Sequence, residues 1–138
     1  MKKNFLDIGF DYDFILYGIV SQEASHRLAW LINNQVHTNF SRNDDLQLIF
    51  ENDELLQVSH FSFNDEINHL QFDFFSNKDE SNYWMPELRK IDYFIMVKGA
   101  LESFRKRKFT EPFKKIEAIQ IITEINHRKL KQKERLIF

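Results

Sequence analysis

The sequence predicts an α+β fold: a mostly antiparallel sheet of about six strands, packed by two main helices, in the order β-α-β-β-β-β-α-β. Three observations support this prediction. Residues 55–63 and 68–75 alternate apolar and polar side chains with a period of two, which is typical of paired strands. Residues 21–36 repeat apolar side chains on one helical face. No linker-like stretch divides the 138 residues, so we expect a single α+β domain over residues 1–138.

The first strand is expected at residues 10–20, where apolar side chains alternate with Asp11 and Asp13 and then occupy both faces, as in a central strand. A helix should follow at once. Ser21 is its expected N-cap, because a serine hydroxyl can accept a hydrogen bond from a first-turn backbone amide. The buried stripe of this helix is expected to comprise Ala24, Leu28, Leu31 and Ile32.

The middle of the chain predicts three further strands. Residues 39–45 are polar and are expected to form a turn before a short strand at residues 45–50. In the hairpin that follows, a turn at residues 64–67 would place Phe61 opposite Leu70. One face of the hairpin would then be apolar and buried. The other face would be polar and exposed to water, and would carry His60, Ser62, His69, Gln71 and Asp73.

The last third of the chain should complete the sheet. Residues 100–116 have a helical pattern, with a break expected near Phe109 because Pro112 is tolerated only in the first turn of a helix. Thr110 is the expected cap of the second helical piece. Two apolar runs predict the remaining strands, at residues 90–99 and 118–126, and a basic tail follows them.

Composition excludes several classes of protein. The chain has no cysteine, which removes disulfides, thiolate metal sites and a cysteine nucleophile. Its longest strongly apolar run, residues 14–20, has seven residues, whereas a membrane-spanning helix needs about 20. Three scattered glycines cannot form a phosphate-binding loop, and the sequence contains no G-x-S-x-G elbow. We therefore expect a cytoplasmic protein with no membrane contact and no cofactor.

Charge is divided unevenly along the chain. Residues 1–97 carry 16 acidic and 7 basic side chains, whereas residues 98–138 carry 5 acidic and 12 basic ones. This asymmetry indicates either an anionic partner for the basic end or attraction between the two ends within one fold. The candidate residues for binding an anion or a nucleic acid are Arg105, Lys106, Arg107, Lys108, Lys114 and Lys115.

Two histidines are weak candidates for a metal site. The expected hairpin register places His60 and His69 diagonally near each other on the exposed face, with Asp73 further along. Strict alternation places polar residues there without any metal, so we expect none. Most of the paired carboxylates lie in expected turns, and such exposed sites do not provide the differing environments that acid–base catalysis requires.

The stretch WMPELRKIDYF, residues 84–94, combines features of a functional motif. Asp92 stands near the start of a strand that is expected to be buried on both faces, so its carboxylate must find hydrogen-bond donors. Backbone amides of a neighbouring turn, or an arginine, would supply them. Glu87 is the nearest carboxylate to it in this stretch. We expect a structural role for both residues, with catalysis by them as the alternative.

The segment MPELRKIDY, residues 85–93, resembles the signature of an uncharacterised bacterial family known by the motif IPExxxVDY. Met85 and Ile91 replace two other apolar residues of that motif, and residues 18–34 are similar to the amino-terminal half of the family. The resemblance implies no activity, substrate or cofactor. The genes of the family keep company with those for ribonuclease III and pyruvate kinase, which implies a housekeeping or RNA-linked role. Four residues match the motif at its spacing: Pro86, Glu87, Asp92 and Tyr93.

We therefore hypothesise a small non-enzymatic cytoplasmic domain that binds a protein partner or forms a homo-oligomer, through the exposed sheet face or an edge strand. The first alternative is a nucleic-acid-associated (RNA) protein that uses the basic C-terminal third. The second alternative is an enzyme that uses Glu87 and Asp92.

Overall fold

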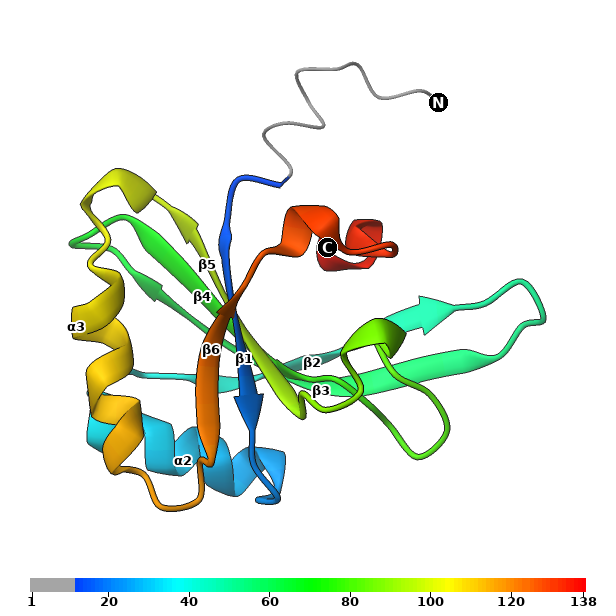
Figure 1. Ribbon diagram of the computed structural model, residues 1–138, viewed down its shortest axis with the longest axis horizontal. Helices are drawn as coiled ribbons and strands as arrows, with labels where there is room; N and C mark the ends of the chain where they lie inside the picture. The colour runs from blue at the N-terminus through cyan, green and yellow to red at the C-terminus, as the bar shows by residue number, and fades with distance from the viewer. Residues whose placement is uncertain (1–11) are drawn as a thin grey trace.

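The computed structural model describes residues 12–138, so the expected start of the first strand at residues 10 and 11, including Asp11, lies outside the described residues. Six strands form one sheet, and every neighbouring pair in it is antiparallel (Figure 1). The order across the sheet is β2-β3-β4-β5-β1-β6. The predicted α+β class is confirmed. The strands are β1 (Ile15–Val20), β2 (Ser41–Ile49), β3 (Leu55–Asp65), β4 (Leu70–Ser76), β5 (Tyr93–Gly99) and β6 (Ile121–Ile125).

Two helical segments cover one face of the sheet, as Figure 1 shows on its left side. They are α2 (Ser25–Val36) and α3 (Lys106–Thr110), and α3 continues directly into the 3₁₀ helix η3 (Glu111–Lys115). Leu28 and Ile32 of α2 and Phe113 of η3 are completely buried against the sheet. The expected apolar face of the hairpin is confirmed, with Phe61, Leu70, Phe72 and Phe74 buried and Phe63 partly buried. Within residues 12–138, no helix has both the length and the apolar character that crossing a membrane requires.

Most of the opposite face of the sheet is also covered, which corrects the expectation that this face is exposed to water, although Gln71 on it is exposed as expected. Phe75, Phe94 and Met96 on this face are completely buried, together with apolar residues from two irregular segments, residues 77–91 and 126–138. His60 and Asp73, both expected in water, are only 7% and 3% exposed. Alternation along a strand shows which residues share a face, but it does not reveal that a distant irregular segment covers that face.

The hairpin of β3 and β4 has a different register from the expected one. Phe61 pairs with Phe74, and Asp65 pairs with Leu70, so the turn lies at residues 66–69. Because the partner of Phe61 moves by an even number of positions, the two faces keep the residues assigned to them. His69 lies in the turn, with a left-handed backbone (φ 56°), and is therefore not beside His60.

The helix ends also differ from expectation. Ser21 is not the N-cap of α2, which begins at Ser25; its hydroxyl instead accepts the backbone N–H of Glu23 at 3.2 Å, in the turn after β1. Thr110 makes no capping bond, and its hydroxyl donates back to the carbonyl of Lys106 at 3.1 Å. The change from α to 3₁₀ geometry after Thr110 nevertheless falls close to the expected break.

Three strands have different limits from those expected. β2 takes in most of the polar segment 39–45, and an irregularity between Asn43 and Leu46 interrupts its pairing with β3. β5 begins only at Tyr93, so Asp92 precedes the strand. β6 is confined to five residues at the edge of the sheet.

Candidate functional site

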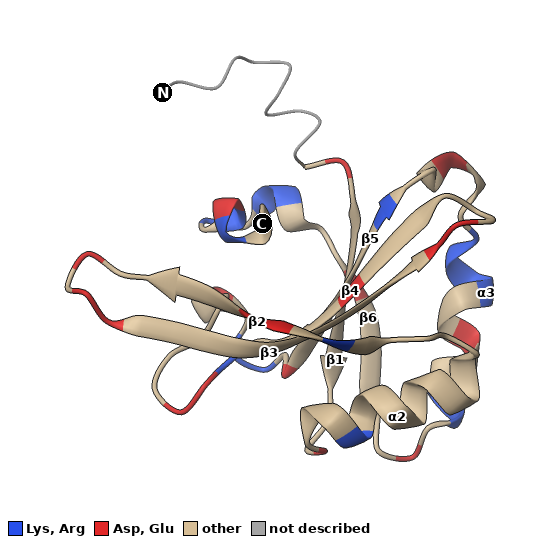
Figure 2. Ribbon diagram, turned by 180° about the vertical axis from the view of Figure 1, so that it is seen from behind, with Lys and Arg blue, Asp and Glu red and all other residues tan. Residues whose placement is uncertain are grey.

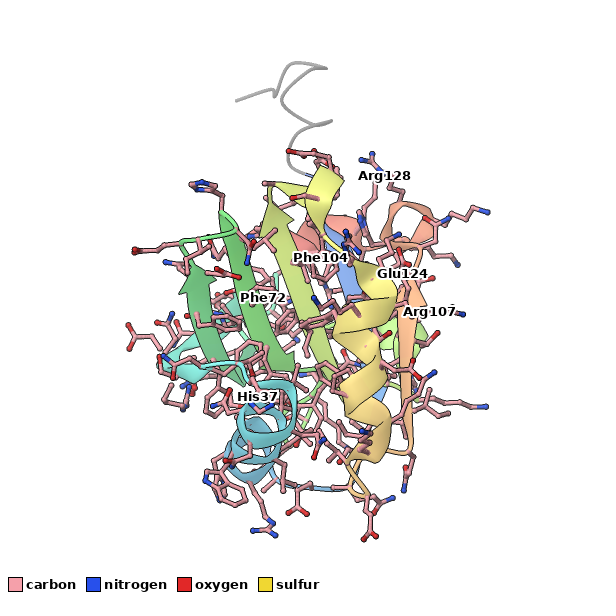
Figure 3. All side chains as sticks on the ribbon, turned by 90° about the vertical axis from the view of Figure 1, so that its left-hand side faces the viewer. His37, Phe72, Phe104, Arg107, Glu124 and Arg128 are labelled. Carbon is pink, nitrogen blue, oxygen red and sulfur yellow. The ribbon has the colours of Figure 1, made fainter. Side chains whose placement is uncertain are left out.

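A groove of about 860 Å³ lies between the end of α2 and the segment formed by α3 and η3. Gln35, His37, Glu111 and Pro112 contribute to its lining. Figure 2 shows α3 as a basic part of the ribbon, and Figure 3 looks onto this side of the molecule. The structure thus brings five of the six predicted basic residues around one groove: Arg105, Lys106, Arg107, Lys108 and Lys115.

The groove is basic because the apolar side chains of α3 and η3 are used for packing. Phe113 is completely buried, and the ring of Phe109 is stacked at 5.4 Å from that of Phe72 in β4. Phe104, just before α3, lies 5.3 Å from Phe109, measured between ring centroids. The phenylalanines that interleave with the cations therefore anchor the segment to the sheet, as their helical spacing predicts. The charged side chains between them remain exposed.

Two lysines of the predicted set are paired with carboxylates. Lys106 Nζ lies 3.0 Å from Glu124 Oε2 of β6, and Lys114 Nζ lies 3.3 Å from Glu111 Oε2. Lys114 does not line the groove. Within residues 12–138, no carboxylate lies within salt-bridge distance of the other four cations, Arg105, Arg107, Lys108 and Lys115.

The alternative explanation of the charge asymmetry was attraction between the two ends of the chain. In the described part of the chain, the salt bridges of the basic third are both made with acids of that same third, Glu111 and Glu124. Direct pairing with the acidic residues of positions 12–97 is therefore not what holds the basic third in place. Its packing on the sheet through apolar side chains does so instead.

His37, an exposed histidine, also lines the groove. It ends α2 with a left-handed backbone (φ 62°), and its N–H donates to the carbonyl of Asn33 at 3.1 Å. This geometry turns the chain sharply and leaves His37 beside the basic segment. In the sequence, His37 is seen only to follow the apolar stripe of α2 directly. That position does not reveal which distant segment lies beside this histidine.

The carboxylate of Asp92 is tied to the backbone of the turn after β1. Its Oδ2 accepts the N–H of Ser21 at 2.9 Å, and its own N–H donates to the carbonyl of Ile19 at 2.9 Å. The hydroxyl of Tyr93 donates to the carbonyl of Glu23 in the same turn. Burial raises the pKa of Tyr93 to about 12, so this hydroxyl keeps its proton at neutral pH. One backbone amide, that of Ser21, thus supplies a donor of the kind that the sequence required for the Asp92 carboxylate.

Glu87 has a separate role in the structure. It lies in a 3₁₀ turn that begins at Pro86, and its carboxylate accepts the backbone N–H of Lys131 in the C-terminal segment. A cavity of about 490 Å³ is lined by Asp92 and Tyr93, but Glu87 is not among its lining residues. The two carboxylates therefore bind different parts of the backbone. They do not form a convergent acid–base pair.

The two weak metal candidates are not brought together. His60 Nε2 lies 2.7 Å from Asp73 Oδ1 inside the covered face, whereas His69 is in the hairpin turn. Among residues 12–138, no group of three or more histidine, cysteine, aspartate or glutamate side chains is arranged to hold a metal ion.

Comparison of this chain with protein-family models, with curated proteins and with solved structures gave no match. Its resemblance to the family with the IPExxxVDY motif therefore stays a prediction.

Proposed function

We propose that this protein binds nucleic acid through the groove between α2 and α3. The observation that carries this proposal is that five basic residues, one of them (Lys106) paired with Glu124, line one groove of about 860 Å³ whose lining holds a single carboxylate, Glu111. A phosphate backbone is the regular, extended anion that such a row of cations fits. We also propose a cytoplasmic location, which the absence of cysteine supports, and membership of the IPExxxVDY family, which the motif at residues 85–93 supports.

The binding energy would come mainly from phosphate contacts. Each lysine or arginine that contacts a phosphate releases condensed counterions, so affinity falls as salt rises. Arg107 and Lys115 are both exposed and line the groove. A double change to glutamate there should reverse part of the local charge without disturbing the buried phenylalanines.

The experiment is a fluorescence-anisotropy titration with a labelled single-stranded oligonucleotide at several salt concentrations. The Arg107→Glu/Lys115→Glu variant should bind at least about tenfold more weakly. Its plot of log affinity against log salt concentration should be shallower by about one to two units, because about one to two phosphate contacts are lost. The matched control is Arg89→Glu/Lys90→Glu, the same change at two exposed cations of the 77–91 segment. No detectable binding by the wild type, or an equal loss in the control, would refute the proposal.

A second candidate function is association with a protein partner or with a second copy through an edge strand. The sheet-face form of this hypothesis has less support, because most of both faces is covered. β6 is an edge strand with Ile121 53% exposed, whereas the β2 edge carries charged residues and an irregularity, which discourage pairing. If β6 mediates self-association, light scattering should show an oligomer that Ile121→Lys dissociates. Ile67→Lys, at an 89% exposed isoleucine in the β3–β4 turn, is the control and should leave the oligomer intact.

A further inference from the structure

A second cavity, of about 380 Å³, adjoins the basic groove. The two share Arg105 and Lys108, together with His37 and Pro112, so the cations stand at the junction between them. The part of the lining that belongs to the second cavity alone is aromatic and polar. It includes Phe63, Phe72, Phe104 and Phe109 and, at the rim, Thr38, Asp65, Asn68 and Ser103.

The cavity exists because the helices leave part of the sheet uncovered at this end. Figure 3 shows Phe72 of β4 and Phe104, which precedes α3, above His37 at the end of α2. Phe72 is 4% exposed and is stacked at 4.5 Å on Phe63, with an angle of 3° between the rings. The centroid of Phe104 lies 6.3 Å from that of Phe72. Phe63 and Phe104 are only partly buried, so aromatic surface from both remains available to a ligand.

The charges around this cavity are separated. Arg105 and Lys108 lie on the side shared with the groove, whereas Asp65 lines this cavity but not the groove. The carboxylate of Asp65 accepts the N–H of Asn68 at 3.1 Å and its Nδ2–H at 2.8 Å, and the hydrogen bonds from Asn68 hold the pKa of Asp65 below its usual range. A phosphate is therefore attracted to the cations and repelled from Asp65. A planar ring with amino or imino donors fits the opposite end.

From this arrangement we infer that the ligand is single-stranded nucleic acid, with one base stacked on Phe63 and Phe104 and its neighbouring phosphates on Arg105 and Lys108. The inference rests on the proposed function and adds the form of the nucleic acid to it. In a duplex the base faces are stacked on one another and cannot reach the phenylalanines. Base–aromatic stacking tolerates any base, so the site selects single strands without selecting a sequence.

The test compares two oligonucleotides that carry the same number of phosphates. One is oligothymidylate, and the other is an abasic strand of equal length. Wild-type protein should bind oligothymidylate about 5- to 150-fold more tightly, which is the range expected for one stacked base. Phe104→Leu should reduce this difference several-fold while leaving the salt dependence unchanged, because leucine keeps the apolar volume but has no ring face and only the ring of Phe63 remains to stack on the base. Phe138→Leu, at a 43% exposed ring on the opposite side of the sheet, is the matched control and should keep the difference.

The possible failures are distinguishable. Equal binding of the two strands by wild type, with both weakened by Arg107→Glu/Lys115→Glu, would overturn the stacked base and leave the proposed function standing. Binding of neither strand would overturn both. Thymidine monophosphate binding as tightly as the oligonucleotide would overturn the polymeric ligand. Ultraviolet crosslinking of oligothymidylate to the wild type avoids any folding defect of a variant. A crosslink at Phe63 or Phe104 would support the inference, and crosslinks only elsewhere would contradict it.

Discussion

The two faces of the sheet are covered in different ways. On one face, helical segments pack through apolar stripes and leave an open basic groove and an aromatic cavity beside it. On the other, the irregular segments 77–91 and 126–138 (Figure 1) cover an equally apolar surface. Hydrogen bonds to the backbone hold these segments there. The completely buried side chain of Asn77, for example, donates to the carbonyls of Leu88 and Ile91 and accepts the N–H of Met85. The helical covering therefore leaves a groove and a cavity open to solvent, whereas the irregular segments leave most of the second face buried.

The strongest test of closure concerns the buried pair of His60 and Asp73. His60→Leu should lower the free energy of unfolding by about 2–3 kcal/mol, because it leaves the buried carboxyl group of Asp73 beside only the 3.3 Å contact from Gln71. Chemical denaturation measures this loss. The double variant His60→Leu/Asp73→Leu should recover much of it, because no uncompensated polar group then remains. A loss below about 1 kcal/mol for the single variant would mean that water reaches this face.

Matched leucines on the two faces sharpen the comparison. Leu28 in α2 and Leu136 in the C-terminal segment are both 0% exposed. Leu28→Ala should cost about 3 kcal/mol, because a regular helix packed on the sheet cannot collapse into the cavity. Leu136→Ala should cost less, about 1–2 kcal/mol, because an irregular terminal segment can shift or open locally. Equal losses in denaturant titrations would show that the two coverings are equally rigid.

A smaller effect is expected at Glu87, which binds the backbone N–H of Lys131. Glu87→Ala should reduce overall stability by about 1 kcal/mol or less but accelerate amide hydrogen exchange across residues 126–138. Glu80→Ala, at an exposed glutamate of the same irregular segment, should change neither. Unchanged exchange in the Glu87 variant would show that this bond does not hold the C-terminal segment.

The smallest effect should come from pH. Burial lowers the pKa of His127, whose Nε2 lies 2.7 Å from the carbonyl oxygen of Phe14 and whose ring stacks on the ring of Phe14. The unfolded chain therefore takes up the proton more readily than the folded one. Stability should fall as the pH drops below about 6.5, and the loss should level off at the folded pKa. His127→Phe should remove this component from the pH dependence of the unfolding free energy, and an unchanged slope would contradict the assignment.

The difference between the faces also explains how much of the fold could be predicted. Periodicity in residues 55–75 and in α2 identified the strands, the helix and the first buried face, because regular elements repeat their apolar residues at fixed intervals. The second covering has no such period. Trp84, Met85 and Leu136 are buried there from segments that read as a loop and a basic tail. Only the tertiary structure shows that these segments meet the sheet.

The candidate site likewise has a part that the sequence could predict and a part that it could not. The basic residues were identified because a contiguous run, Arg105 to Lys108, stays together in any fold. His37 and the aromatic cavity were not predicted as parts of a site, because they depend on how α2, β4 and α3 approach one another. Asp92 was expected to need donors because it was placed in a buried strand; it lies just before β5 and is only partly buried, and its carboxylate accepts the N–H of Ser21.

If the proposal is right, the helical face binds ligand and the loop-covered face does not. A titration of isotopically labelled protein with oligothymidylate, followed by NMR, distinguishes the two faces. We expect backbone shift changes at residues 105–115, His37 and Phe63, with residues 127–138 unaffected. Changes centred instead on Lys129, Lys131 and Lys133 of the C-terminal segment would contradict it.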